Sequence, residues 1–323
     1  MGANTKIEWT DHSWNPWVGC TKVSPGCDNC YAERLMDTRM HKVQWGAGQP
    51  RVRTSEENWI QPLRWNARAK REGRRCKVFC ASLADVFDNE VPEEWRADLF
   101  DLIRRCENLD FLLLTKRVGN VPGMVRAVAR RLGGWPHVDT MPVPLPANVW
   151  LGATVVDQPE ADRDIPKLLA VPAAKRFLSM EPLLSAVDIG CAIYPDNLRM
   201  LSRLFPRETT RRSPMIDWVI VGGESGPGAR PMHVSWARSI VQQCKAAGVP
   251  VFVKQLGAQP RGWCAGIAAA DDPESNYESD YCEFYEAHEI KDPCRGRCAF
   301  FCHPKGASPL EWPADLRVRE VPA

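Results

Sequence analysis

Short runs of apolar residues recur along the chain, and each is followed by turn residues and then by a longer amphipathic or mixed stretch. The runs are rich in β-branched and aromatic residues and nearly continuous in hydrophobicity, which is typical of parallel strands buried on both faces. The pattern allows one strand near the N-terminus and predicts six more, over residues 77–82, 111–116, 148–155, 175–181, 217–223 and 249–257.

Two of the intervening stretches carry clear helix punctuation. The first begins with Pro92, Glu93 and Glu94, residue types favoured in a first helical turn. The second is predicted to start at Ser235 as its N-cap and to end at Gly248 as its C-cap. Strands that alternate with helices indicate a parallel sheet joined by right-handed crossovers.

This alternation predicts an α/β fold with a complete or partial (β/α) barrel, and a doubly wound open sheet is the alternative. In both architectures, functional groups gather at the carboxyl ends of the strands. The residues that follow the predicted strands are polar, so a site at that rim is credible. They are Ser82, Asp85, Thr115, Lys116, Thr154, Ser179, Glu181, Gly222, Gly223, Glu224, Lys254 and Gln255.

The chain has 323 residues, of which 44% are hydrophobic and 25% are charged, enough apolar material for a substantial core. We expect residues 1–257 to form the barrel core, interrupted by a basic, proline-containing insertion around 191–216. Residues 258–304 are polar, contain five cysteines and are predicted to form an irregular Cys-rich insertion. Residues 305–323 regain turn punctuation and are predicted to form a tail that packs on the core.

The net charge of +2 does not indicate a nucleic-acid or membrane partner. The N-terminus lacks the apolar core of a signal peptide, and no stretch approaches the roughly 20 apolar residues of a membrane span. We therefore expect a cytoplasmic protein.

Thirteen cysteines are a high count for a chain in a reducing compartment. Metal ligation or redox chemistry is expected where cysteines cluster, and ordinary burial where they do not. Five are scattered through strand-like or helix-like segments and are predicted to be small core residues: Cys76, Cys80, Cys106, Cys191 and Cys244.

The strongest chemical signal is the segment GCTKVSPGCDNCYAERL, in which Cys20, Cys27 and Cys30 lie at C-x6-C-x2-C spacing in one loop. Thiolates are soft ligands suited to iron–sulfur clusters, zinc or Cu(I). Three cysteines are one fewer than a closed cluster or a structural zinc site uses. The fourth ligand is either another residue of the chain or a substrate.

Several separated motifs make the sequence resemble a family of phage- and bacterium-encoded three-cysteine-motif proteins, grouped with the radical S-adenosylmethionine (SAM) superfamily. The resemblance covers nearly the whole chain except 191–216 and 258–304. The motifs are TKIEWTDHSWNPWVGC, CTKVSPGCDNCYAE, FLLLTKR, RFLSMEPLL, WVIVGGESG and EWPADLRVRE.

The resemblance implies a [4Fe–4S] cluster on Cys20, Cys27 and Cys30, with SAM on the fourth iron and reductive cleavage of SAM to a 5′-deoxyadenosyl radical. It also implies a reductant protein as electron donor. The spacing departs from the superfamily's usual C-x3-C-x2-C, and Asn29 stands where an aromatic residue often precedes the last cysteine. A wider loop is physically tolerable because only the convergence of the sulfurs is required.

Superfamily members hold the SAM amino group with a Gly-Gly-Glu after an early strand, whereas Gly222, Gly223 and Glu224 follow a late one. Here the early strand ends near Ser82 and Asp85. Ser82 is predicted to bind the carboxylate or the ribose of SAM, and Asp85 is predicted to bind its ammonium group. The glycine pair is interpreted either as a tight turn or as a ligand contact.

Three more strand-end residues are predicted to contact a ligand. Thr154 is a further candidate for cofactor binding. Glu181, with Glu224, is predicted to bind ribose hydroxyls or the substrate, or to anchor a loop. Lys254 ends an apolar strand, where its ammonium needs an anion or water, so a carboxylate or phosphate is expected near it. Glu181, Glu224 and Lys254 are also the candidate catalytic residues.

A second set of cysteines, at C-x11-C-x3-C-x3-C spacing, lies in the predicted insertion. Four thiolates would suit zinc or an auxiliary iron–sulfur cluster, and a long irregular insertion needs something to order it. The alternative is unligated thiols. The four residues are Cys282, Cys294, Cys298 and Cys302.

The segment 64–75 is strongly basic, and Trp59 and Trp65 lie nearby. Such a run can contact phosphates while an aromatic ring stacks on a base, although a solvated helix face is the more common explanation. Together with the resemblance, the sequence predicts a radical SAM enzyme, with nucleic acid or a nucleotide as its candidate substrate. The alternative is a non-catalytic nucleic-acid-binding protein stabilised by zinc or an iron–sulfur cluster.

Overall fold

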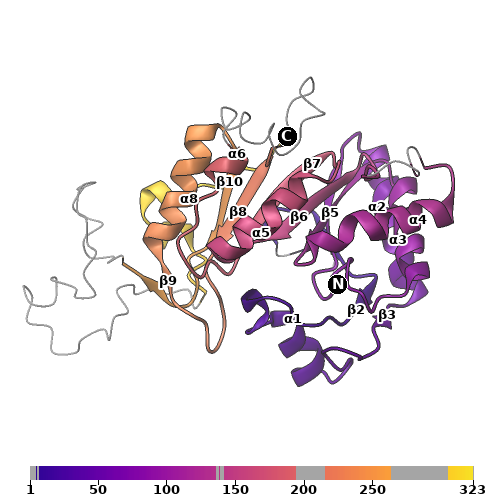
Figure 1. Cartoon of the computed structure of the whole chain (residues 1–323), viewed down its shortest axis with the longest axis horizontal. Helices are drawn as coiled ribbons and strands as arrows, with labels where there is room; N and C mark the ends of the chain where they lie inside the picture. Colours follow the sequence, from indigo (N-terminus) through magenta and orange to yellow (C-terminus); the bar gives the residue numbers. More distant parts are fainter. Residues whose placement is uncertain are drawn as a thin grey trace, which may run out of the picture. The chain divides into compact units, whose positions relative to one another are not determined.

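The computed structural model describes residues 5, 7–135, 138, 142–193, 215–262 and 305–322. It is a mixed α/β fold with one seven-stranded sheet of order β1-β4-β5-β6-β7-β8-β10 (Figure 1). The pairings whose registers are described are all parallel. The strands of the sheet are β1 His12–Trp14, β4 Cys76–Cys80, β5 Leu109–Thr115, β6 Val149–Thr154, β7 Lys175–Met180, β8 Trp218–Gly222 and β10 Val251–Gln255.

All six strands predicted from apolar runs are present, with ends that differ by one or two residues, and β1 is the further strand near the N-terminus. The strand order follows the chain, and β1 and β10 are the two ends of the sheet. A doubly wound sheet would reverse its strand order at a switch point. Because the order shows no such reversal, the sheet is not doubly wound. Because β1 and β10 are its two ends and are not paired with each other, the sheet is open, as in a partial barrel rather than a complete one.

Seven α-helices, a π-helix over Arg34–Arg39, four short 3₁₀ helices and two short strand pairs complete the described elements. The strand pairs are antiparallel β2 Trp17–Val18 with β3 Val52–Arg53, and parallel β9 Met232–His233 with β11 Pro260–Arg261. The helices are α1 Tyr31–Glu33, α2 Glu56–Arg71, α3 Glu93–Arg105, α4 Val121–Leu132, α5 Gln158–Leu169, α6 Gly190–Ile193 and α8 Val234–Ala247.

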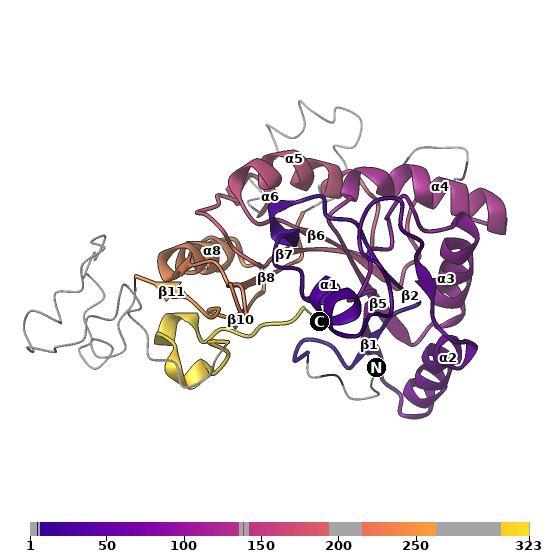
Figure 2. The same ribbon diagram turned by 90° about the horizontal axis from the view of Figure 1, so that it is seen from below.

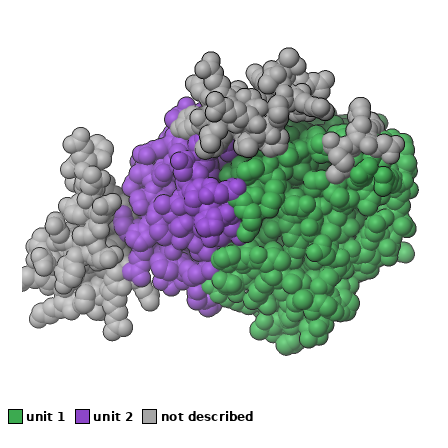
Figure 3. All heavy atoms as spheres, in the orientation of Figure 1, with its two compact units in different colours: residues 1–154, 163–178, 214–216 green, residues 155–162, 179–213, 217–323 purple. Residues whose placement is uncertain are grey.

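The chain divides into two compact units (Figure 3). Unit 1 comprises residues 1–154, 163–178 and 214–216, and it contains the three-cysteine loop. Unit 2 comprises residues 155–162, 179–213 and 217–323.

In unit 1, α2 packs against the strands β4 and β5 and contacts α3, which in turn packs against α4 (Figure 2). α3 begins at Glu93, one residue after the predicted start at Pro92, which is its N-cap, and Leu99, Phe100 and Ile103 form its fully buried face. Burial of such a side chain contributes about 1.5–3 kcal/mol, so this helix is held mainly by its apolar face.

In unit 2, α8 buries its apolar face, which includes Ile240 and Cys244. The helix ends at Gly248, whose left-handed φ of 68° confirms the predicted C-cap. The predicted N-cap was wrong, because the helix begins at Val234 with His233 as its N-cap, so Ser235 lies inside the first turn. The helix follows the strand β9 directly, because β9 ends at His233 and Val234 is already helical.

The C-terminal segment of unit 2 lies along β10. Val253 N donates to Val318 O at 2.9 Å, and Glu320 N donates to Val251 O at 3.0 Å. The indole of Trp312 is buried and donates to Gly306 O. These contacts pair the outer edge of β10 with the end of the chain.

Four of the scattered cysteines are free and buried, as predicted: Cys76, Cys80, Cys106 and Cys244. Burial raises the pKa of the Cys106 and Cys244 thiols to about 12, so both are neutral core groups near pH 7. The side chain of Cys191 lies outside the described residues.

Candidate functional site

The three-cysteine loop follows β2 and starts beside the end of β4. Gly19 N donates to Leu83 O at 3.1 Å, and Gly19 forms a parallel bridge with Ala84. Gly19 has a φ of 112°, and a Cβ there would lie 3.0 Å from Arg51 Cδ. Glycine is therefore required where the loop passes over Arg51, and this close approach places Cys20 at the carboxyl end of β4.

The second half of the loop is a short 3₁₀ turn, Pro25–Cys27, followed by α1. Ser24 Oγ accepts a hydrogen bond from Gly26 N at 3.0 Å and caps this turn. Cys30 N donates to Cys27 O at 3.2 Å, so the last two cysteines lie on consecutive turns directly before α1. The local sequence thus brings Cys27 and Cys30 together, while Cys20 is held from the sheet side.

The residue types of this loop fit a cluster held by thiolates. Cys20, Cys27 and Cys30 are free, Cys27 is buried and the other two are half-buried. Among the residues that the structure describes, no three His, Cys, Asp or Glu side chains are grouped as a metal-ion site. The case for a cluster at this loop therefore rests on the presence of three thiol ligands. To bind it, the three sulfurs would have to move closer together, as in sites where metal binding is coupled to folding.

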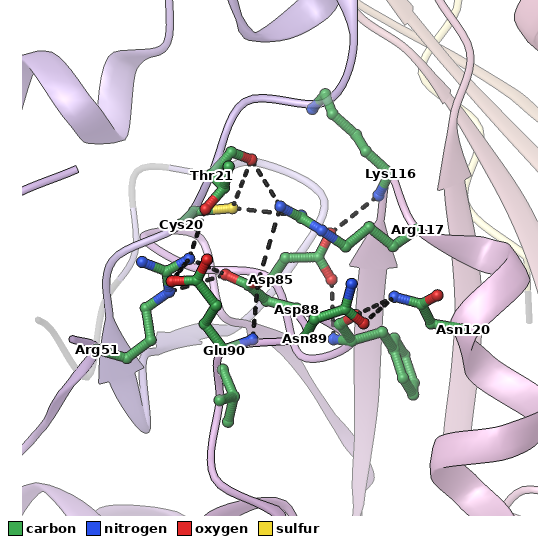
Figure 4. A network of polar contacts seen from close by, with 12 residues as sticks. Cys20, Thr21, Arg51, Asp85, Asp88, Asn89, Glu90, Lys116, Arg117 and Asn120 are labelled. Atoms are coloured by element: carbon green, nitrogen blue, oxygen red, sulfur yellow. Dashed lines mark hydrogen bonds and ion pairs between the residues drawn. The ribbon is translucent and has the colours of Figure 1, made fainter. Parts of the chain in front are cut away.

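A network of buried charges lies behind Cys20, at the ends of β4 and β5 (Figure 4). Asp85 is 5% exposed, and its carboxylate accepts hydrogen bonds from the Thr115 hydroxyl at 2.8 Å, Lys116 N at 3.1 Å and Arg117 Nη1 at 3.1 Å. The same Nη1 donates to Cys20 Sγ at 3.4 Å. The end of β5 is thereby joined to the start of the three-cysteine loop.

A second buried pair, Arg51 with Asp88, completes this network. Arg51 Nη2 lies 2.7 Å from Asp88 Oδ2, and the two side chains are 0% and 2% exposed. Arg51 also donates to the Thr21 hydroxyl at 2.7 Å and to Gly46 O at 3.1 Å. One guanidinium therefore links the loop after Cys20 to the segment that follows β4.

Sequence reasoning found Cys20 and Asp85 but missed Arg51, Asp88 and Arg117. Charged residues in loops are usually solvated, so nothing in their own spacing marked them as buried. Two signals were available in the sequence. Arg117 directly follows Lys116 at a strand end, and Asp88 lies three positions after Asp85.

Burial, with the carboxylates of Asp85 and Asp88, raises the pKa of the Cys20 thiol from 9.0 to about 11. A raised pKa keeps this thiol protonated below that pH. In the metal-free folded protein, the rate of Cys20 alkylation by iodoacetamide should therefore still rise about tenfold per pH unit between pH 8 and 10. Peptide mass spectrometry of timed samples measures this rate. In the unfolded chain the rate should level off near pH 9, and a similar levelling in the folded protein would contradict the expectation.

Ser82 and its neighbours have a structural role at the end of β4. Ala81 has a φ of 64°, a left-handed conformation that a non-glycine residue rarely adopts and that often occurs at functional sites. Beyond this bend, Asn15 Nδ2 donates to Ser82 Oγ at 3.0 Å and Asn15 Oδ1 accepts from Leu83 N at 2.7 Å. The predicted contacts of Ser82 and Asp85 with SAM stay predictions, and their observed contacts anchor the turn.

Thr154 ends β6 and is 2% exposed. Its hydroxyl has no hydrogen-bond partner within the described part of the chain. A buried hydroxyl without a partner is costly, so Thr154 retains an unused hydrogen-bonding group at the end of its strand.

In unit 2, Glu181, Lys254 and Gln255 meet at the ends of β7 and β10. Lys254 Nζ lies 2.8 and 2.9 Å from the two carboxylate oxygens of Glu181, and Gln255 Nε2 donates to Glu181 Oε1 at 3.0 Å. The anion expected near Lys254 is thus supplied by the chain itself. The predicted ligand contacts of Glu181 and Lys254 remain open to test.

The Gly222–Gly223–Glu224 segment is explained by packing. A Cβ on Gly223 would lie 2.5 Å from Leu256 O, which real structures do not tolerate, and Gly223 N donates to Gln255 O. Glu224 is 7% exposed and accepts hydrogen bonds from Arg230 N and Arg230 Nη2, both at 2.8 Å. The close approach of the segments that end β8 and β10 explains why position 223 is a glycine, and this explanation needs no bound ligand.

The basic segment 64–75 lies at the end of α2 and just beyond it. Trp59 and Trp65 are buried, and Trp65 stacks on His12 with 4.3 Å between ring centroids. Three arginines are paired with carboxylates: Arg68 with Glu72, Arg74 with Glu72 and Asp11, and Arg75 with Asp110. The tryptophans are thus part of the core, and these contacts give no support to base stacking there.

Two further predictions fall outside the described residues. The four cysteines of the proposed second metal site, Cys282, Cys294, Cys298 and Cys302, belong to the stretch 263–304. Most of the predicted insertion around 191–216 does so as well. Both stay predictions.

The sequence profile of a family described as a protein of unknown function (DUF5131) matches residues 4–283. The chain belongs to this family. In this DUF5131 protein, the match includes the three-cysteine loop, the buried network and the Glu181–Lys254 pair. No curated protein and no solved structure matches the chain. None of the helices within the described ranges has the length and apolar character needed to cross a bilayer.

Proposed function

We propose that this DUF5131 protein is a radical SAM enzyme. One observation carries the proposal: a loop with three free thiols begins at the carboxyl ends of parallel strands, where a buried network holds its first cysteine. In open and closed parallel α/β sheets alike, ligands bind at this edge. The resemblance described above favours a cluster over zinc.

Cys20, Cys27 and Cys30 would hold a [4Fe–4S] cluster through three thiolates and leave one position for SAM. A bound cluster supplies one electron at low potential, which is the chemistry that reductive cleavage of SAM needs. The chain's own contribution is placement. Gly19 lets the loop pass over Arg51, and Arg117 holds Cys20 beside β5.

Ser82, Asp85 and Thr154 are the proposed polar contacts for SAM in unit 1. Thr154 has the best supporting observation, since its hydroxyl lacks a partner among the described residues. Glu181, Glu224 and Lys254 are the proposed ligand contacts in unit 2, with Gly222 and Gly223 serving the turn. We propose a class of reaction and assign no substrate. Because Trp59 and Trp65 are buried, their side chains do not favour a nucleic-acid substrate at α2.

Anaerobic reconstitution of the full chain with iron and sulfide tests the proposal. Protein that has bound about four iron and four sulfide per chain should convert SAM to methionine and 5′-deoxyadenosine when dithionite is added. Omission of dithionite is the control for non-reductive breakdown. A colourless protein that holds only zinc, or a loaded protein that leaves SAM intact, would refute the proposal.

A further inference from the structure

The guanidinium of Arg117 joins the three-cysteine loop to the acidic side chains behind it. Its Nη1 donates to Cys20 Sγ at 3.4 Å and to Asp85 Oδ2 at 3.1 Å, and its Nη2 donates to Thr21 O at 2.6 Å (Figure 4). The side chain is 8% exposed, so these contacts are largely shielded from water. From this geometry we infer that Arg117 is a positioning residue that holds Cys20 and sets the reduction potential of the cluster. The inference rests on the proposed function.

The backbone aims Arg117 at the loop before any ligand binds. Arg117 lies between β5 and the 3₁₀ turn Val118–Asn120, its N donates to Thr115 Oγ1 at 2.8 Å, and its carbonyl oxygen accepts from Asn120 N at 2.9 Å. Both sides of the residue are therefore fixed. The guanidinium is further held by the Asp85 carboxylate, so little conformational freedom remains to be lost when the sulfur gains charge.

The charges around Cys20 explain why the cation matters. Asp85 and Asp88 lie 3.1 and 3.9 Å from Arg117 nitrogens, so the sulfur has two carboxylates nearby. Negative charge on the sulfur is disfavoured by both carboxylates and favoured by Arg117. Reduction adds one electron to a cluster, and hydrogen bonds to ligand sulfurs together with local charge set its potential. Arg117 should therefore make the potential less negative than it would otherwise be.

The midpoint potential of the reconstituted full chain, measured by a redox titration followed by electron paramagnetic resonance (EPR), tests this inference. Arg117→Gln should lower the equilibrium constant for one-electron reduction about tenfold, a potential about 59 mV more negative. Arg117→Lys keeps the charge but loses the planar fork, so it should shift the potential in the same direction by less. Lys116→Gln is the matched control, because it removes one positive charge from the adjacent residue, which joins this network through its backbone N–H to Asp85 (Figure 4), and it should leave the potential nearly unchanged.

The outcomes separate this inference from the function on which it rests. A wild-type chain that binds no cluster overturns both. If the wild-type chain binds a cluster and both Arg117→Gln and Arg117→Lys have the wild-type potential, the inference alone is overturned, even if their iron content or melting temperature falls. If Arg117→Gln takes up no iron, Arg117→Lys decides: a more negative potential supports the inference, and an unchanged potential overturns it.

Discussion

Replacement of Asp88 by alanine is expected to lower the free energy of unfolding by about 3–5 kcal/mol. Asp88 is 2% exposed and its Oδ2 lies 2.7 Å from Arg51 Nη2, whose side chain is fully buried. Removal of the carboxylate leaves the buried guanidinium with the more distant and more exposed carboxylate of Glu90, 3.3 Å from Arg51 Nη2, as its counter-ion. Equilibrium unfolding in urea, followed by tryptophan fluorescence, measures the change.

Glu72→Gln is the matched control for this variant. Glu72 also pairs with arginines, Arg68 and Arg74, but on the surface of unit 1. Exposed pairs contribute little because water screens them, so this variant should unfold like the wild type. If Asp88→Ala were as stable as Glu72→Gln, Arg51 would not be buried against Asp88 as described.

Replacement of Cys30 by alanine should abolish both cluster binding and SAM cleavage. Two thiolates cannot hold the [4Fe–4S] cluster that three are proposed to hold, so the reconstituted variant should contain less than about one tenth of the wild-type iron. Cys30 is half-buried and precedes α1, so its loss leaves the core of unit 1 intact. Iron and sulfide content with 5′-deoxyadenosine formation are the measurements.

Cys106→Ala controls for the loss of a cysteine as such. Cys106 is fully buried at the end of α3, and its removal should reduce stability while iron content and SAM cleavage persist. Retention of a full cluster by Cys30→Ala would show that the ligand assignment is wrong.

The sheet could be predicted well because its strands are buried on both faces and read as apolar runs. Each run between Cys76 and Gln255 became a strand, and sequential connections then ordered the strands. Helix ends were less predictable. Ser235 has the right chemistry for an N-cap, but α8 begins one residue before it, directly after the strand that ends at His233.

The buried network could not be predicted, because burial of a charged side chain depends on partners distant in sequence. Arg51 and Asp88 are 37 residues apart, and Arg117 is 97 residues from Cys20. Asp85 illustrates the same limit. Its contact with SAM stays a prediction, but the hydrogen bonds that its carboxylate accepts from Thr115, Lys116 N and Arg117 could not be predicted from its place after a strand.

The most direct test of a cluster with one open iron on Cys20, Cys27 and Cys30 is the EPR spectrum of the reduced protein with and without SAM. The reduced wild-type protein should show the signal of a [4Fe–4S]⁺ cluster, and its g values should shift when SAM is added. A protein without such a signal, or with a signal that excess SAM leaves unchanged, would contradict this assignment.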